Sequence, residues 1–210
     1  MRADSIAFAI SGMLFGVIVG WILGSQQSAG VAATAAPSVA AAAPATAGPA
    51  DRAPAAPLDE SRSQALVAAA AGAPSDPSPR VELANLYFDA ERYPEAVEWY
   101  EQALRLKPDD ANVSTDLGVA YYYTDQPDKA IQQFEQSLKV DPKHTKTMLN
   151  MGIVKAFGKQ DLAGAAAAWQ QVIATAPDSP EAQAAKKALE GLQQAHPGGP
   201  AAPPAGASGA

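Results

Sequence analysis

The sequence predicts an all-α fold in which a transmembrane helix precedes a solenoid of paired helices. Three observations predict it: a long uncharged apolar run near the amino terminus, a residue pattern that recurs every 34 positions, and confinement of almost every charged side chain to residues 51–196. The apolar run suits a bilayer, and a fixed period of that size is typical of stacked helical repeats. The charged segment is long enough to form one domain with its own core.

The amino-terminal residues 1–24 are predicted to be a membrane anchor. Residues 6–23 hold no charge, and only Ser11 is polar. As a helix they would extend about 27 Å, close to the thickness of a hydrocarbon core of about 30 Å. A cleaved signal peptide is the alternative, but its apolar stretch is usually about 7–15 residues long. We therefore expect an uncleaved anchor.

The charges that flank this anchor predict its orientation. Arg2 precedes the apolar run, and no further Lys or Arg follows until Arg52. The positive-inside rule then keeps the amino end in the cytoplasm and sends the rest of the chain across. We expect a single-pass protein of a bacterial inner membrane whose repeat domain is periplasmic or otherwise extracytoplasmic.

Four glycines within the anchor recur at every fourth residue: Gly12, Gly16, Gly20 and Gly24. On a helix they would form one smooth ridge on which a second helix could pack closely. The alternative is that glycine is simply frequent in membrane helices. If the ridge is a contact, its partner is either a second copy, giving a homo-oligomer, or another protein.

Two segments are predicted to be disordered. Residues 25–57 are rich in Ala and Pro, and residues 197–210 consist of small residues and proline with no charge. Neither has the apolar periodicity or the large side chains needed to offset the entropy of ordering. The first would act as a spacer between membrane and domain, and the second as a tail.

The domain between these segments, residues 58–196, contains the 34-residue period. A set of seven positions recurs with residues alike in kind. The first copy is Leu83, Ala84, Tyr87, Ala96, Tyr100, Ala103 and Pro108, and the second is Leu117, Gly118, Tyr121, Ala130, Phe134, Ser137 and Pro142. Pro94 and Pro127 suit the first turn of a helix, and the prolines that close each copy end the helix before them. The pattern predicts two helices per repeat.

This pattern resembles the tetratricopeptide repeat family, in which Leu-Gly-x-x-Tyr lies on a first helix and Ala-x-x-x-Phe on a second. The repeats would be residues 77–110, 111–144 and 145–179. In the third, Lys155 stands at the usual Tyr position, and we expect one extra residue to lengthen the inter-helix turn near residues 157–164. Flanking helices are expected at 60–72 and 180–194, with Ser179 as N-cap of the latter.

Composition argues against several classes of function. A formal net charge of −7 does not suit nucleic acid, and a chain without cysteine has no disulfide or thiolate chemistry. His144 and His196 lie far apart, which leaves little for metal or acid–base chemistry. We expect no enzyme activity, no metal and no cofactor.

The resemblance implies a protein–protein interaction module that binds a peptide or protein segment in a concave groove. The alternative is a structural scaffold of the cell envelope that self-associates through the glycine ridge. In layout the chain is similar to small single-span repeat proteins of the bacterial envelope. Some of those assist cytochrome c maturation or attend the protein translocon, so the similarity selects no pathway.

The family's groove positions carry over to the first helix of each repeat. The expected groove residues are Asn85, Phe88, Asp89, Asn112, Thr115, Val119, Tyr122, Tyr123, Lys146, Asn150 and Ile153. Chaperone-binding members hold a C-terminal carboxylate here with lysines, asparagines and an arginine. Asn85 and Lys146 match that clamp, whereas Val81, Asp116 and Asn150 do not. We therefore expect an extended or helical segment with apolar anchors, unless the aromatic residues only pack against neighbouring helices.

Overall fold

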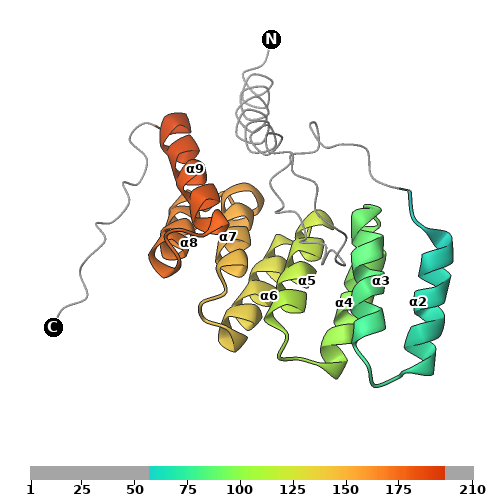
Figure 1. Cartoon of the computed structure of the whole chain (residues 1–210). Helices are drawn as coiled ribbons and strands as arrows, with labels where there is room; N and C mark the ends of the chain where they lie inside the picture. The colour runs from blue at the N-terminus through green and yellow to red at the C-terminus, as the bar shows by residue number, and fades with distance from the viewer. Residues whose placement is uncertain (1–56, 197–210) are drawn as a thin grey trace, which may run out of the picture.

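The computed structural model describes residues 57–196 and contains eight α-helices and no strand in that range (Figure 1). The all-α prediction is confirmed there. Residues 1–56 and 197–210 lie outside the described residues, and with them the predicted anchor, the predicted tail and all but the last residue of the predicted linker. Among the helices of residues 57–196, none combines the length and the apolar character needed to cross a bilayer.

The helices follow one another with short connections. They are α2 (Glu60–Gly72), α3 (Ser78–Asp89), α4 (Tyr93–Leu106), α5 (Ala111–Tyr123), α6 (Pro127–Val140), α7 (Thr145–Ile153), α8 (Leu162–Thr175) and α9 (Pro180–Ala195). Local sequence explains several starts, because Asp59, Asp110 and Ser179 each accept a hydrogen bond from a backbone N–H three residues on. Proline lies in the first turn of α4, α6 and α9, where its missing N–H costs nothing.

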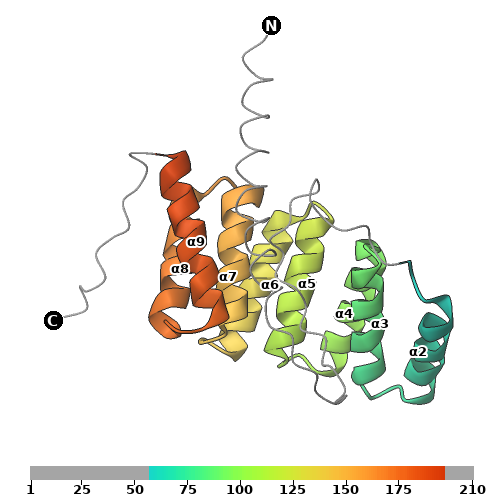
Figure 2. The ribbon, with the colours of Figure 1, turned by 45° about the horizontal axis from the view of Figure 1, so that its top comes forward.

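The helices pack as antiparallel pairs stacked in chain order. α3 packs on α4, α5 on α6 and α7 on α8, and each pair contacts the next. Both views show this row running from α2 at one end to α9 at the other (Figures 1 and 2). The two flanking helices pack on the first and last pairs, so each covers an end of the stack.

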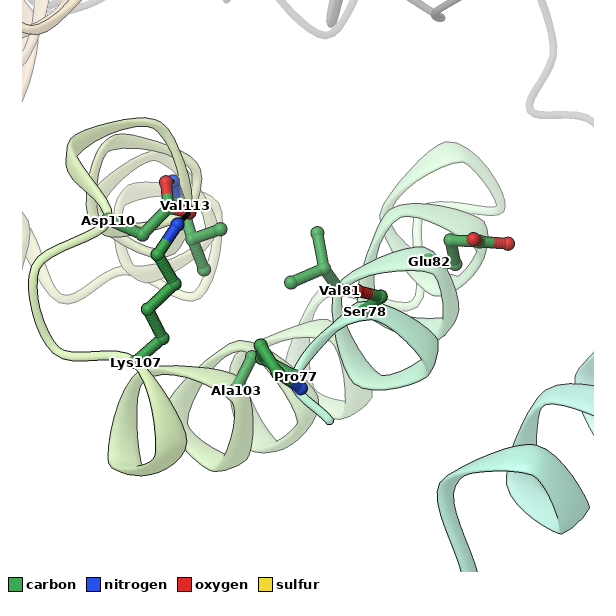
Figure 3. A pocket seen from close by; sticks show the side chains of 8 residues that line it. All are labelled: Pro77, Ser78, Val81, Glu82, Ala103, Lys107, Asp110 and Val113. Carbon is green, nitrogen blue, oxygen red and sulfur yellow. Dashed lines mark hydrogen bonds and ion pairs between the residues drawn. The ribbon is translucent and has the colours of Figure 1, made fainter. Parts of the chain in front are cut away.

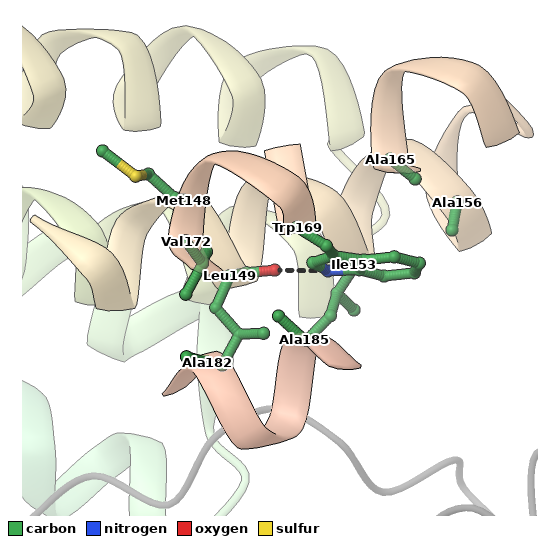
Figure 4. Packing of buried hydrophobic residues seen from close by; sticks show 9 residues of the cluster. All are labelled: Met148, Leu149, Ile153, Ala156, Ala165, Trp169, Val172, Ala182 and Ala185. Carbon is green, nitrogen blue, oxygen red and sulfur yellow. Dashed lines mark hydrogen bonds between the residues drawn. The ribbon is translucent and has the colours of Figure 1, made fainter. Parts of the chain in front are cut away.

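Glycines allow the paired helices to cross closely. A Cβ built on Gly118 would lie 2.4 Å from the Phe134 ring, and one on Gly152 would lie 2.2 Å from the indole of Trp169. Both rings are almost fully buried. The Trp169 indole N–H also donates to the Leu149 carbonyl over 3.2 Å (Figure 4). A small residue opposite a large aromatic ring is therefore the packing unit of each pair.

The extra residue of the third repeat lies in a helix and not in the turn, which corrects the sequence-based expectation. All three inter-helix turns contain three residues, and their equivalent positions Glu91, Asp125 and Gln160 all adopt positive φ. The inserted residue instead widens the end of α7 into a π-helical segment, Val154–Gly158, where the Lys159 N–H bonds to the carbonyl five residues back. This leaves the turn geometry intact.

Candidate functional site

The expected groove residues lie on α3, α5 and α7, one helix from each pair, and we call the surface that they define the first-helix face. The exposed or half-buried members are Asn85, Phe88, Asp89, Asn112, Tyr122, Tyr123 and Lys146. The buried members are Thr115, Val119, Asn150 and Ile153. A segment bound to the surface could contact these four only by displacing other side chains, so their place in a groove stays a prediction. The glycines Gly12, Gly16, Gly20 and Gly24 fall outside the described residues.

Thr115 is buried because it belongs to a cluster of hydroxyl groups between α5, α6 and α7. Its Oγ1 lies 2.6 Å from that of Thr147 and 3.1 Å from the Ser137 hydroxyl, and it donates to the Ala111 carbonyl over 2.7 Å. All three hydroxyl side chains are fully buried. Since buried polar groups must be paired, this cluster fixes the junction between the second and third repeats.

His144, the N-cap residue of α7, extends this cluster toward the surface. Its Nδ1 lies 2.6 Å from Thr147 Oγ1, and its Nε2 lies 3.0 Å from Asn112 Oδ1. Burial lowers the pKa of His144, so the neutral ring donates from Nε2 to the amide oxygen and accepts at Nδ1. Although a hydroxyl, an imidazole and an amide line up here, the Thr147 hydroxyl is buried, so the chain of bonds joins helices instead of exposing a nucleophile.

The face of the third repeat is covered by α9. Leu149 and Ile153 of α7 are buried in one apolar cluster with Ala182 and Ala185 of α9 (Figure 4). Asn150, between them, is 2% exposed and donates from Nδ2 to the Lys146 carbonyl. The part of the first-helix face that stays open is therefore formed by α3 and α5.

The two residues that match the carboxylate clamp already have partners within the chain. The Tyr100 hydroxyl donates to Asn85 Oδ1 over 2.6 Å. Lys146 Nζ donates to Asp116 Oδ1 over 2.7 Å. Burial raises the pKa of Asp116, and the ammonium of Lys146 offsets only part of that effect. With its lysine neutralised by a carboxylate, this face has little attraction for an acidic C-terminus.

The aromatic residues of the face pack against one another. Phe88 meets Tyr93 and Tyr123 edge to face, with ring centroids 5.2 and 5.7 Å apart, and Tyr93 stacks on Tyr123 at 4.6 Å. Tyr122 tilts against Tyr123 at 5.8 Å. Such pairs stabilise the junction of the first two repeats, and this packing is the alternative that the sequence left open. Half-buried edges remain at the surface, so the cluster closes one end of the open face.

A pocket lies at the other end of the open face, where α3 and α5 begin and α4 ends. Its volume is about 270 Å³, and it is lined by Pro77, Ser78, Val81, Glu82, Ala103, Lys107, Asp110 and Val113. In Figure 3, Val81 and Val113 face each other across it, Lys107 reaches toward Asp110, and Glu82 points away on the far side of α3. The Lys107 ammonium donates to Asp110 over 3.0 Å. The pocket thus has an apolar floor with a charged rim.

Sequence reasoning missed most of this pocket. Only first-helix positions were carried over from the family, whereas Ala103 and Lys107 lie at or beyond the end of α4, and Asp110 is the N-cap of α5. A signal was present in Lys107 and Asp110, which flank the repeat-closing proline at a spacing of three residues. Tyr93 was also missed, although it directly precedes the proline that starts α4.

The described residues contain no group of three or more metal-ligating side chains close enough to hold an ion. The expectation of no metal and no cofactor remains a prediction for the whole chain.

The stacked helix pairs, each with a small residue against an aromatic ring, are typical of a helical-repeat protein. Two family models match the sequence: one described as TPR repeat matches residues 84–125, and one described as tetratricopeptide repeat matches residues 111–144. Residues 84–144 therefore consist of tetratricopeptide repeats. A search of the curated proteins finds no match.

Solved structures share this fold. The first TPR of Spaghetti (RPAP3), bound to the HSP90 peptide SRMEEVD, has 21% identity and a TM-score of 0.50, covering 66% of this chain and 95% of that one. MamA has 17% identity and a TM-score of 0.53, covering 63% and 88%. The Sgt2 TPR domain from Aspergillus fumigatus has 22% identity and a TM-score of 0.52, covering 64% and 90%. At these identities the similarity establishes the fold.

Proposed function

We propose that this protein is a membrane-anchored interaction module that holds a segment of another protein on the open part of its first-helix face. The observation that carries the proposal is the unequal covering of that face. α9 buries Leu149 and Ile153 on α7, whereas α3 and α5 keep exposed side chains and an apolar pocket. Solenoids of this class offer an extended surface to such partners.

Anchoring is the part of the proposal that rests on sequence. Residues 6–23 have the length and composition of a membrane span, and the segment that joins them to the domain contains 33 residues. As a flexible chain that segment would reach on the order of 30 Å. A partner captured by the repeats would therefore be held near the bilayer, which suits an assembly factor or adaptor, for example in envelope-protein or cytochrome c biogenesis.

The peptide complex of RPAP3 shows that a related fold can accept a short segment. Its peptide, SRMEEVD, is acidic toward its end. Here Lys146 is paired with Asp116, and Asn85 accepts from Tyr100, so the groups that match a carboxylate clamp are engaged. We therefore propose that this chain also binds a short segment on its first helices, but without a carboxylate clamp.

Site-specific photocrosslinking tests the proposal in membranes. A benzophenone amino acid placed at Asp89 or Asn112, both exposed on the first-helix face, should crosslink one discrete partner. The same probe at Glu98 on α4 or Glu135 on α6, which are exposed outside that face, is the matched control and should not. Equal yields from all four positions, or a product from the control positions only, would place the binding surface elsewhere.

A structural scaffold is the second candidate, and the glycine ridge is the observation that favours it. Gly12, Gly16, Gly20 and Gly24 would let two anchor helices pack closely. Replacing Gly16 and Gly20 by isoleucine should halve the mass of the detergent-solubilised protein if the ridge joins two copies. An unchanged mass removes self-association through the anchor and leaves the interaction module.

A further inference from the structure

The pocket between α3, α4 and α5 has the dimensions of one large apolar side chain with room for its flanking backbone. Val81 is partly buried against the adjoining core, and Val113 and Ala103 are core residues that form the floor. Removing apolar surface from water there would favour binding. The pocket therefore suits an aliphatic or aromatic side chain. The charges around the pocket indicate whether the segment that carries this side chain is acidic or basic.

Charge is distributed unequally along the solenoid. Residues 57–128, which include α2 to α5, carry fourteen acidic and five basic side chains, a formal charge of −9. Residues 129–196 carry six acidic and eight basic side chains, a formal charge of +2. The pocket lies in the acidic half, and the field of that half attracts cations over about a Debye length, roughly 10 Å at 0.1 M salt.

The five cations of the acidic half are already engaged. Three of them form side-chain ion pairs with acids on the same or the next element: Arg92 with Glu95, Arg105 with Glu101, and Lys107 with Asp110. Arg62 lies 3.9 Å from Glu82, and Arg80 donates to main-chain carbonyls at the end of α2 and just after it. None is left to receive an acidic ligand.

A carboxylate remains along the same face. Asp89 lies on α3 two helical turns beyond Val81, on the side that also holds Asn85. It is exposed and forms no hydrogen bond or ion pair with the described residues. Burial raises the pKa of Asp89, and the charge of Arg62 offsets only part of that effect. A cation supplied by a ligand would further stabilise the ionised form of Asp89.

We propose that the pocket receives an aliphatic or aromatic side chain of a basic segment, of which a lysine or arginine pairs with Asp89. This inference rests on the proposed function and names the chemistry of its partner. It predicts a ligand opposite in charge to the acidic peptide held by RPAP3.

Fluorescence anisotropy on the full chain in detergent tests the proposal with three labelled twelve-residue peptides. The first alternates lysine and serine around one central leucine, the second has serine in place of that leucine, and the third has glutamate in place of each lysine. We expect the first to bind, the second to bind about tenfold or more weakly, and the third not to bind. Binding of none of the three, or of the glutamate peptide as well as the first, would overturn the proposal.

Matched variants locate the binding. Val81→Asp should abolish the advantage of the leucine peptide over the serine peptide, whereas Val140→Asp, at a valine 43% exposed on α6, should preserve it. Asp89→Asn should weaken the first peptide up to about fivefold at low salt. The control Glu98→Gln, on α4, should not. Circular dichroism checks that each variant keeps its helices.

Other outcomes separate this inference from the proposed function. If the peptides fail while the probe at Asn112 still crosslinks a partner in membranes, the proposed chemistry of the partner is wrong and the binding face stands. If the probe fails as well, both are wrong. A mass that rises with protein concentration at low salt, and that Val81→Asp abolishes, would identify the occupant as a second copy and overturn the basic-segment proposal.

Discussion

In the pairs α5–α6 and α7–α8, a glycine without a Cβ lets the two helices pack closely. Gly118 lies against the Phe134 ring, and Gly152 lies against Trp169, in equivalent places of successive repeats. Phe134 is fully buried, so its ring has no free volume into which to retreat. The first repeat reaches the same end with Ala84, which packs in one core cluster with Tyr100.

We predict that Gly118→Ala lowers the free energy of unfolding by about 1–3 kcal/mol, because its Cβ would overlap the Phe134 ring. Gly72→Ala is the control, since a Cβ there meets nothing within 4 Å and should leave stability unchanged or raise it by up to about 1 kcal/mol. Urea unfolding of both variants measures the difference. Equal stability of the two would contradict the packing described.

A second residue-scale prediction concerns pH. Because burial lowers the pKa of His144, the unfolded chain takes up a proton at a higher pH than the folded chain. The stability that the neutral ring contributes is therefore present above the ordinary histidine pKa of about 6.5 and is lost as pH falls below it. His144→Gln, whose amide can donate to Asn112 and accept from Thr147, should show a smaller loss between pH 7.5 and 5.5. Identical losses, measured by urea unfolding, would refute this role.

At the scale of elements, α9 determines how much of the first-helix face is open. It packs on α8 and α7 and buries Leu149 and Ile153 beneath Ala182 and Ala185. Its start is fixed by the Ser179 side chain, which accepts from the Ala182 N–H over 3.0 Å. The helix that covers one end of the stack thus also limits the proposed binding surface.

We predict that Ser179→Ala destabilises the domain by about 1 kcal/mol, because it removes the N-cap of α9. The neighbouring Asp178→Ala, at an exposed position, should change stability by no more than about 0.5 kcal/mol. Thermal unfolding compares them. A cap variant as stable as its neighbour would mean that α9 is held by packing alone.

The sequence predicted the repeat elements better than it predicted the site. Residues such as Leu83, Tyr100 and Phe134 repeat their spacing because each repeat buries the same face, so the fold could be read from them. Exposure does not repeat in this way. Position five of the first helix is partly open at Val81 but buried at Thr115 and Leu149, since each later helix is covered by more neighbours.

At the scale of the whole molecule, the proposed anchor and the charge asymmetry act together. An acidic half that attracts a basic segment, tethered by a linker to a bilayer, would raise the local concentration of its partner at the membrane. The side of the membrane on which this happens depends on the orientation of the anchor. The sequence predicts that orientation from Arg2, because no other Lys or Arg lies near the apolar run.

We predict that alkaline phosphatase fused after Ala210 is active and that a fluorescent protein fused there is dark in bacterial cells, because the proposed topology puts the repeats outside the cytoplasm. The opposite pattern would invert the topology. Carbonate extraction of the same cells should leave the protein in the membrane fraction. Mass spectrometry showing a shortened, extractable chain would identify a cleaved signal peptide instead.

The proposed function requires a partner segment to bind across α3 and α5. Hydrogen–deuterium exchange of the full chain, free and with the partner captured by crosslinking, tests it most directly. We predict slower exchange within residues 78–89 and 111–123 on binding and unchanged exchange within residues 127–140, the helix behind them. Slower exchange confined to residues 127–140, or no change in either first helix, would contradict binding across α3 and α5.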